Sequence, residues 1–199
     1  MRGGSLLMWQ EYFSQGLVVG LDLEPNPLTK VPDRVRFYQG SQGDGALLDK
    51  VAGECAPDGF DVVIDDAAHR GELSRVSYRH LFVNHLKPGG IYVVEDWGTG
   101  YWDSWPDGAA YRMAPEKQAG RPKEGMPLLA RLAKRLGWSS DPNFAVHNYG
   151  MVGFVKELVD EVAWPDITFP ERGNSGLPRR ASMIREMTVY CGQAFLVKA

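Results

Sequence analysis

Two short apolar runs in the middle of the chain constrain its fold most, because each ends abruptly in a pair of acidic residues. The run 60–64 is followed by Asp65 and Asp66, and the run 91–94 is followed by Glu95 and Asp96. Apolar runs of this length are typical of strands buried on both faces of a sheet. The sequence therefore predicts two core strands whose ends carry carboxylates.

The segment between the two runs completes a recognisable unit. Residues 71–86 have the pattern of a helix, and a Lys-Pro-Gly-Gly turn at 87–90 would stop that helix and lead into the second strand. A strand, a helix and a second strand in this length form a right-handed βαβ unit with parallel strands. We therefore expect an α/β fold built around residues 60–96.

Neighbouring parallel strands lie roughly 4.8 Å apart with their carboxyl ends at one edge of the sheet. The four carboxylates would then crowd together and repel one another unless protons or a cation neutralised them. An oxygen-rich cluster without cysteine suits Mg²⁺. His69 lies three residues beyond Asp66 and is the natural candidate for a base. A purely structural role is the alternative, in which Asp65 or Asp66 caps the following helix.

The N-terminal third predicts part of a nucleotide-binding unit. A turn at Gly3, Gly4 and Ser5 precedes a helix at 6–13 and a strand at 17–22 that ends in Asp22, where such units hold ribose hydroxyls. The strand that usually precedes the glycines is missing here, so we expect a truncated sheet. A further strand at 35–38 leads to a turn and a helix at 46–54. Polar side chains of that turn could contact an adenine or cap the helix: Ser41, Gln42 and Asp44.

From 97 to 148 the composition shifts to aromatic residues among glycine, proline and aspartate, which favours a lid or a substrate loop over regular structure. The alternative is that the rings cover the core; they are Trp97, Tyr101, Trp102, Trp105 and Tyr111. Within this segment, 126–136 has a helical pattern with one basic face. A helix at 151–162 and an antiparallel hairpin of strands at 182–190 and 193–198 complete the chain.

Composition excludes several classes of function. A chain of 199 residues with 44% hydrophobic and 24% charged residues fits a single globular domain, residues 1–199. A net charge of −3 gives no electrostatic case for binding nucleic acid or an anionic membrane. The distant Cys55 and Cys191 match no metal or redox spacing, and no apolar stretch is long enough to span a bilayer. We expect a cytoplasmic protein with reduced thiols; a homo-oligomer is compatible with the sequence.

Several of these motifs together resemble a known family. The opening turn and the strand ending in Asp22 resemble the first motifs of class I S-adenosylmethionine-dependent methyltransferases. The motifs at 65–69 and 88–96 resemble the Mg²⁺-dependent sugar O-methyltransferases that tailor macrolide antibiotics such as mycinamicin and macrocin, with relatives described as cephalosporin hydroxylases. The resemblance implies a Rossmann-like sheet with a C-terminal antiparallel hairpin, and methyl transfer to a sugar hydroxyl of a glycosylated natural product.

The resemblance also implies roles for single residues. It makes Asp66, Glu95 and Asp96 the Mg²⁺ ligands and His69 the catalytic base. S-adenosylmethionine would lie against a further set of positions: Gly3, Gly4, Ser5, Asp22, Gln42, Asp44 and Asp65. Two rivals remain open: a metal-dependent hydrolase that uses the same carboxylates, and a non-catalytic methyltransferase-like module.

Overall fold

The computed structural model describes residues 3–26, 28, 30–113, 147–169 and 176–199. The helix expected at 126–136 and most of the aromatic segment lie outside these residues. Within them, no helix is both long and apolar enough to cross a bilayer. Helices and strands alternate along most of the chain, which confirms the α/β prediction.

The strands form two hydrogen-bonded groups. Parallel strands β1 (Val18–Asp22) and β2 (Val35–Gln39) make a two-stranded sheet. The second sheet has the order β3-β4-β6-β5, from the strands β3 (Phe60–Asp65), β4 (Leu86–Glu95), β6 (Gln193–Lys198) and β5 (Ile184–Val189). Strands β3 and β4 are parallel, whereas β4, β6 and β5 are successively antiparallel. The predicted βαβ unit and the C-terminal hairpin are thus confirmed.

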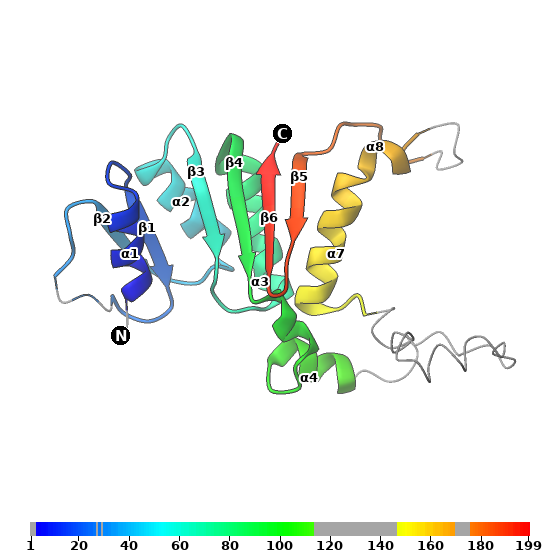
Figure 1. Ribbon diagram of the computed structural model, residues 1–199, viewed down its shortest axis with the longest axis horizontal. Helices are drawn as coiled ribbons and strands as arrows, with labels where there is room; N and C mark the ends of the chain where they lie inside the picture. Colours follow the sequence, from blue (N-terminus) through cyan, green and yellow to red (C-terminus); the bar gives the residue numbers. More distant parts are fainter. Residues whose placement is uncertain (1–2, 27, 29, 114–146, 170–175) are drawn as a thin grey trace, which may run out of the picture.

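The sheets lie in one layer without being joined. Figure 1 shows β2, β1, β3, β4, β6 and β5 in that order across the molecule, with the arrowheads of β1, β3 and β4 at the same edge. Among the described residues, no ladder of hydrogen bonds connects β1 to β3.

The helices lie close to their predicted positions. They are α1 (Gly4–Tyr12), α2 (Gly45–Cys55), α3 (Gly71–Ser77), the π-helical turn η1 (Tyr78–Asn84), the 3₁₀ turn η2 (Trp97–Tyr101), α4 (Pro106–Met113), α7 (Gly150–Val162) and α8 (Trp164–Ile167). Two details differ from the sequence pattern. The helix expected at 71–86 widens into a π-helical turn at Tyr78, and β4 already begins at Leu86.

The early start of β4 has a local cause. Leu86 pairs with Phe60, and the register then shifts so that Ile91 pairs with Val62. The expected turn is therefore an irregularity inside the strand, with Gly89 at φ +78°. Such a conformation is readily available to glycine.

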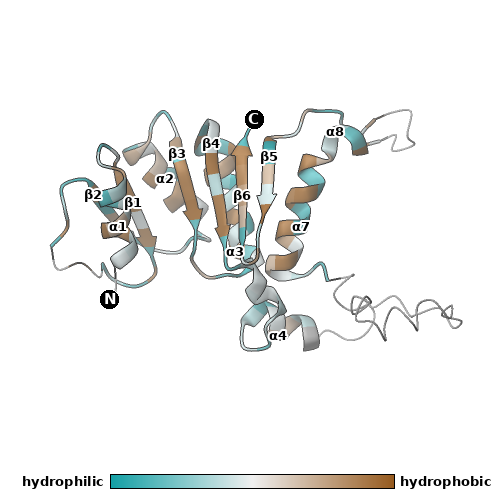
Figure 2. Ribbon diagram, viewed as in Figure 1, coloured by the Kyte–Doolittle hydropathy of each residue, from teal (hydrophilic) through white to brown (hydrophobic). Residues whose placement is uncertain are grey.

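The core lies mainly between the four-stranded sheet, η1 and α7. Aromatic rings dominate its centre, where Tyr78, Phe82, Tyr92 and Phe154 pack at centroid distances between 4.6 and 6.0 Å. Figure 2 shows the corresponding concentration of apolar residues in the central strands and along α7. The core thus supports the end of β4, where the second acidic pair lies.

A single cation bonds the C-terminal end of helix α1 and the turn that follows it. The guanidinium of Arg34 donates hydrogen bonds to the carbonyls of Gln10, Phe13 and Gly16 at distances of 2.7–2.8 Å. Arginine thereby satisfies carbonyls that the end of a helix leaves without partners. The helix contributes no fully buried residue of its own, and Leu6 packs against Gly20 of β1.

Candidate metal and cofactor site

The two acidic pairs meet where strands β3 and β4 end. Asp65 pairs in register with Val94, so Asp66 and Asp96 follow neighbouring parallel strands at the same edge. The expected juxtaposition is confirmed at the level of the backbone. Ligands of open α/β sheets bind at this edge.

Three side chains at this edge come close enough to share an ion. One ligand atom from each of Asp66, His69 and Asp96 lies within 4.8 Å of the other two. The Nε2 atom of His69 is 3.7 Å from Asp66 Oδ1 and 3.9 Å from Asp96 Oδ2. The two exposed carboxylates supply oxygen donors of the kind that Mg²⁺ prefers. The residues present therefore fit the Mg²⁺ ion that the sequence predicts.

Glu95 lies near this group without belonging to it. Among the described residues, the cluster of ligand atoms contains Asp66, His69 and Asp96 only. Partial burial, together with the charges of Asp66 and Asp96, raises the pKa of Glu95. Its assignment as a metal ligand stays a prediction.

The electrostatics of the cluster favour a cation. Burial raises the pKa of Asp66, and the neighbouring Asp96 carboxylate raises it further, whereas His69 opposes the shift. Two carboxylates this close together disfavour each other's ionised form. A bound cation would remove this repulsion.

The backbone at the cluster is held in an unusual conformation. His69 at φ +47° and Asp96 at φ +50° are the non-glycine residues with positive φ in the described part of the chain. Asp96 is stabilised locally, because Thr99 donates to its carbonyl from both the amide and Oγ1. Such conformations cost energy and concentrate at functional sites.

Asp65 points inward and has a different environment. Successive residues of a strand face opposite sides, so Asp65 is buried while Asp66 is exposed. Its carboxylate accepts hydrogen bonds from Gln42 Nε2 at 2.9 Å and from Tyr92 OH at 3.1 Å. Burial raises the pKa of Asp65, and these hydrogen bonds oppose the rise.

Gln42 links this buried network to the loop that carries His69. Its Oε1 accepts from Ala68 N at 2.8 Å, and its Nε2 also donates to Ser77 Oγ at 3.1 Å. Both ends of the amide are therefore used inside the protein. The cofactor contacts predicted for Gln42 and Asp65 stay predictions; the contacts that the structure contains position the Asp66–His69 loop.

We expect Gln42→Leu to lower both the stability and the Mg²⁺ affinity. The substitution leaves a carboxylate oxygen of Asp65 and the amide of Ala68 without their partner, and each such loss costs about 1–3 kcal/mol. Urea unfolding and titration with Mg²⁺ measure the two effects. Gln39→Leu is the control, because Gln39 is exposed and makes one side-chain hydrogen bond, to Leu23 O. Equal effects of the two substitutions would contradict a special role for Gln42.

The other predicted cofactor residues occupy the same edge as the acidic pairs. Gly3 has φ +83° and precedes α1, whose first turn carries Gly4 and Ser5, and Figure 1 shows this end of α1 beside the end of β1. Asp22 Oδ1 accepts from Glu24 N at 3.0 Å. Asp44 Oδ1 accepts from Leu47 N and caps α2, so of its two predicted roles the structure contains the cap.

Most of the described aromatic residues of this segment pack against other side chains, and one is exposed. Trp105 contacts the His69 ring edge-on at a centroid distance of 5.2 Å. Trp97 packs against the core and donates to Tyr190 O, and Tyr111 stacks on the buried His147 at 3.7 Å. Trp102 is 54% exposed, which leaves it as the ring of this group most open to a ligand.

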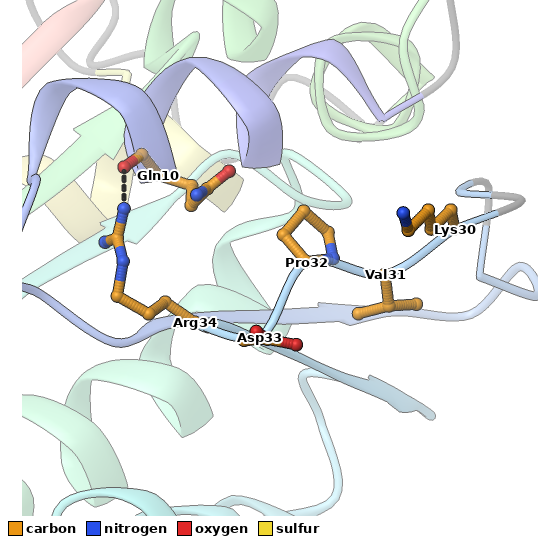
Figure 3. Close-up of a pocket in the computed structure, with 6 residues that line it drawn as sticks. All are labelled: Gln10, Lys30, Val31, Pro32, Asp33 and Arg34. Carbon is orange, nitrogen blue, oxygen red and sulfur yellow. Dashed lines mark hydrogen bonds between the residues drawn. The ribbon is translucent and has the colours of Figure 1, made fainter.

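The pocket in Figure 3 belongs to a different part of the molecule. Its volume is about 660 Å³, and its lining consists of Gln10, Lys30, Val31, Pro32, Asp33 and Arg34. Most of its lining residues directly precede β2 in the sequence. The pocket lies away from the edge where the acidic pairs gather. Figure 3 shows Arg34 bonded to the carbonyl of Gln10, so this cation serves the packing of α1.

Comparison with known proteins places this geometry in context. No protein-family model matches the chain. It is 33% identical over 181 residues to mycinamicin VI 2''-O-methyltransferase of Micromonospora griseorubida, which covers 88% of this chain and 42% of that relative. It is 43% identical over 100 residues to demethylmacrocin O-methyltransferase of Streptomyces fradiae, covering 50% of this chain and 24% of that protein.

A solved structure matches nearly the whole chain. The MycE methyltransferase from the mycinamycin biosynthetic pathway, in complex with Mg, SAH and mycinamycin VI, superposes with a TM-score of 0.64. The sequences are 30% identical, and the match covers 98% of this chain and 40% of that chain. The α/β fold with its mixed sheet thus matches the corresponding part of that enzyme's structure. The chain spans less than half the length of these relatives.

Proposed function

Because the chain is related to the class I S-adenosylmethionine-dependent methyltransferases that act with Mg²⁺ on macrolide sugars, we propose that it transfers a methyl group to a sugar hydroxyl. The acceptor would be a glycosylated natural product. The observation that carries the proposal is the cluster of Asp66, His69 and Asp96 at the carboxyl edge of β3 and β4. Related structures contain Mg and SAH, and this cluster offers the donors that such an ion needs.

Asp66 and Asp96, with Glu95 beside them, would hold the ion through carboxylate oxygens. The bound ion would orient neighbouring hydroxyls of the acceptor and lower the pKa of the attacking one. His69 would accept the proton of that hydroxyl at Nε2, the ring nitrogen that faces both carboxylates. The turn at Gly3 and the carboxylate of Asp22 would hold the methyl donor, and holding donor and acceptor in line supplies much of the remaining acceleration.

We further propose that the chain forms one methyltransferase-like domain with a Rossmann-like sheet. In this sheet a further strand lies between β1 and β3. The facing edges of β1 and β3 have no strand partner among the described residues, and unpaired edges of this kind are normally covered. An extended segment parallel to both strands would pair both edges. The described start of the aromatic segment, 97–113, would border the acceptor.

Calorimetric titration with SAH in the presence and absence of Mg²⁺ tests the function. We expect SAH to bind, and we expect Mg²⁺ to bind at a single site that requires Asp66 and Asp96. A hydrolase that uses the same carboxylates would bind Mg²⁺ but not SAH. Binding of both ligands without methyl transfer to any glycosylated acceptor would favour the non-catalytic module. Absence of binding of either ligand would contradict the proposal.

A further inference from the structure

We infer that Asp107 is a positioning residue, which holds the His69 loop in its active conformation from the start of α4. The inference rests on the proposed function, because that function makes His69 the base. Asp107 lies in the aromatic segment, 38 positions after His69 in the chain, and neither spacing nor motif connects the two. Figure 1 shows α4 next to the N-terminal end of α7, at the edge where the acidic pairs gather.

One carboxylate oxygen of Asp107 joins two helices. Its Oδ2 accepts hydrogen bonds from Gly71 N at 2.8 Å and from Met151 N at 2.7 Å. These amides lie in the first turns of α3 and α7, where helices leave N–H groups without internal partners. Neither helix has a side-chain cap from its own N-cap residue. Asp107 is therefore the cap of both, and its negative charge faces the positive ends of two helix dipoles.

The packing leaves the carboxylate little freedom. Asp107 is 6% exposed. A Cβ atom at Gly71 would lie 2.1 Å from the carbonyl oxygen of Gly150, and one at Gly150 would lie 2.3 Å from Asp107 Cγ. The backbones of Gly71 and Gly150 and the side chain of Asp107 meet at this point because residues 71 and 150 are both glycine. Loss of the Asp107 carboxylate therefore removes a contact shared by the first turns of α3 and α7.

The side chain of His69 is weakly anchored, because its Nε2 lies 3.7 Å from Asp66 Oδ1 and 3.9 Å from Asp96 Oδ2, beyond hydrogen-bond distance. Its Nδ1 is buried without a hydrogen-bond partner in the described structure, although a partner on that nitrogen is what usually fixes an imidazole in active sites. Its backbone adopts φ +47°, two residues before Gly71. Its ring contacts Trp105, two residues before Asp107. Asp107 thus fixes the backbone that follows His69 and, through the same segment, the ring that packs against it.

The test compares Asp107→Ala and Asp107→Asn with Glu161→Ala. Glu161 is the matched control: its carboxylate is largely buried, accepts Met183 N at 2.8 Å and lies at the opposite end of α7. For Asp107→Ala we expect kcat to fall by roughly 10- to 100-fold, the loss that a misplaced catalytic group produces, with an unchanged KM for S-adenosylmethionine. Asp107→Asn, which keeps an acceptor oxygen, should recover part of this loss. Glu161→Ala should lose stability without a comparable loss in kcat.

A readout that is independent of turnover separates this inference from the proposed function. In NMR spectra, Asp107→Ala should shift the ring resonances of His69 and speed amide exchange at Gly71 and Met151, whereas Glu161→Ala should leave the ring resonances of His69 unchanged. If Asp107→Ala does not fold, the same measurements on Asp107→Asn test the inference. An unperturbed His69 ring in a folded Asp107 variant would overturn the inference, even for a protein without methyltransferase activity. Equal kcat losses in the Asp107 and Glu161 variants would overturn it as well.

Discussion

Asp96→Asn is expected to abolish Mg²⁺ binding and methyl transfer while leaving the fold intact. The side chain of Asp96 is 62% exposed and contributes no core packing. The backbone of Asp96 adopts φ +50°, a conformation that asparagine adopts more readily than most residues. The substitution therefore removes a charge and a ligand oxygen without disturbing the backbone that presents them.

The sign of the stability change is informative. The charge of Asp96 raises the pKa of both Asp66 and Glu95, after the larger effect of burial in each case. Neutralising Asp96 removes this repulsion, so without Mg²⁺ the variant should melt at the same temperature as the wild type or slightly above it. With Mg²⁺ only the wild type should gain stability, because only a protein that binds the ion in its folded state is stabilised by it.

Thermal melts with and without Mg²⁺ measure both effects. Asp61→Asn is the control, since Asp61 is an exposed carboxylate near the start of β3, paired with Lys87. A Mg²⁺-induced rise in melting temperature that persists in Asp96→Asn would remove Asp96 from the metal site.

The βαβ unit could be predicted because its signals are local. Apolar runs, the acidic residues that end them and the intervening helical pattern all lie within residues 60–96. Parallel pairing of β3 and β4 then brings Asp66 and Asp96 to one edge without any further information. The strand alternation even separates Asp65 from Asp66, because consecutive residues face opposite sides.

The supporting contacts could not be predicted, because they join residues that are distant in the chain. Gln42 reaches Ala68 across 26 positions, and Asp107 reaches Gly71 and Met151 across 36 and 44 positions. Gln42 is a polar residue in a turn and Asp107 is an acid within an aromatic segment, and the residues around them in the sequence do not indicate such distant partners. The signal that existed was the pair of glycines at 71 and 150 at the starts of two helices, which indicates close backbone contact.

Replacement of His69 is expected to lower kcat by roughly 10²–10⁴-fold, the range typical of losing a general base. The base must take a proton from an alcohol that is a weak acid, and the structure offers one imidazole beside the two carboxylates for this step. His69→Asn is the sharper variant, because asparagine tolerates the positive φ of this position better than alanine does. S-adenosylmethionine binding should be unchanged. His80→Asn is the matched histidine control, because His80 lies in η1 with its ring bonded to Asp49 of α2.

The Mg²⁺ affinity of His69→Asn decides between two roles for the ring. If His69 is a base outside the coordination sphere of the ion, the variant should keep near wild-type Mg²⁺ affinity and lose only kcat. If His69 is a ligand of the ion, Mg²⁺ affinity and kcat should fall together, since Nε2 lies within 3.9 Å of the oxygens of Asp66 and Asp96. Turnover at the wild-type rate in the folded variant would exclude both roles and leave orientation by the ion as the source of catalysis.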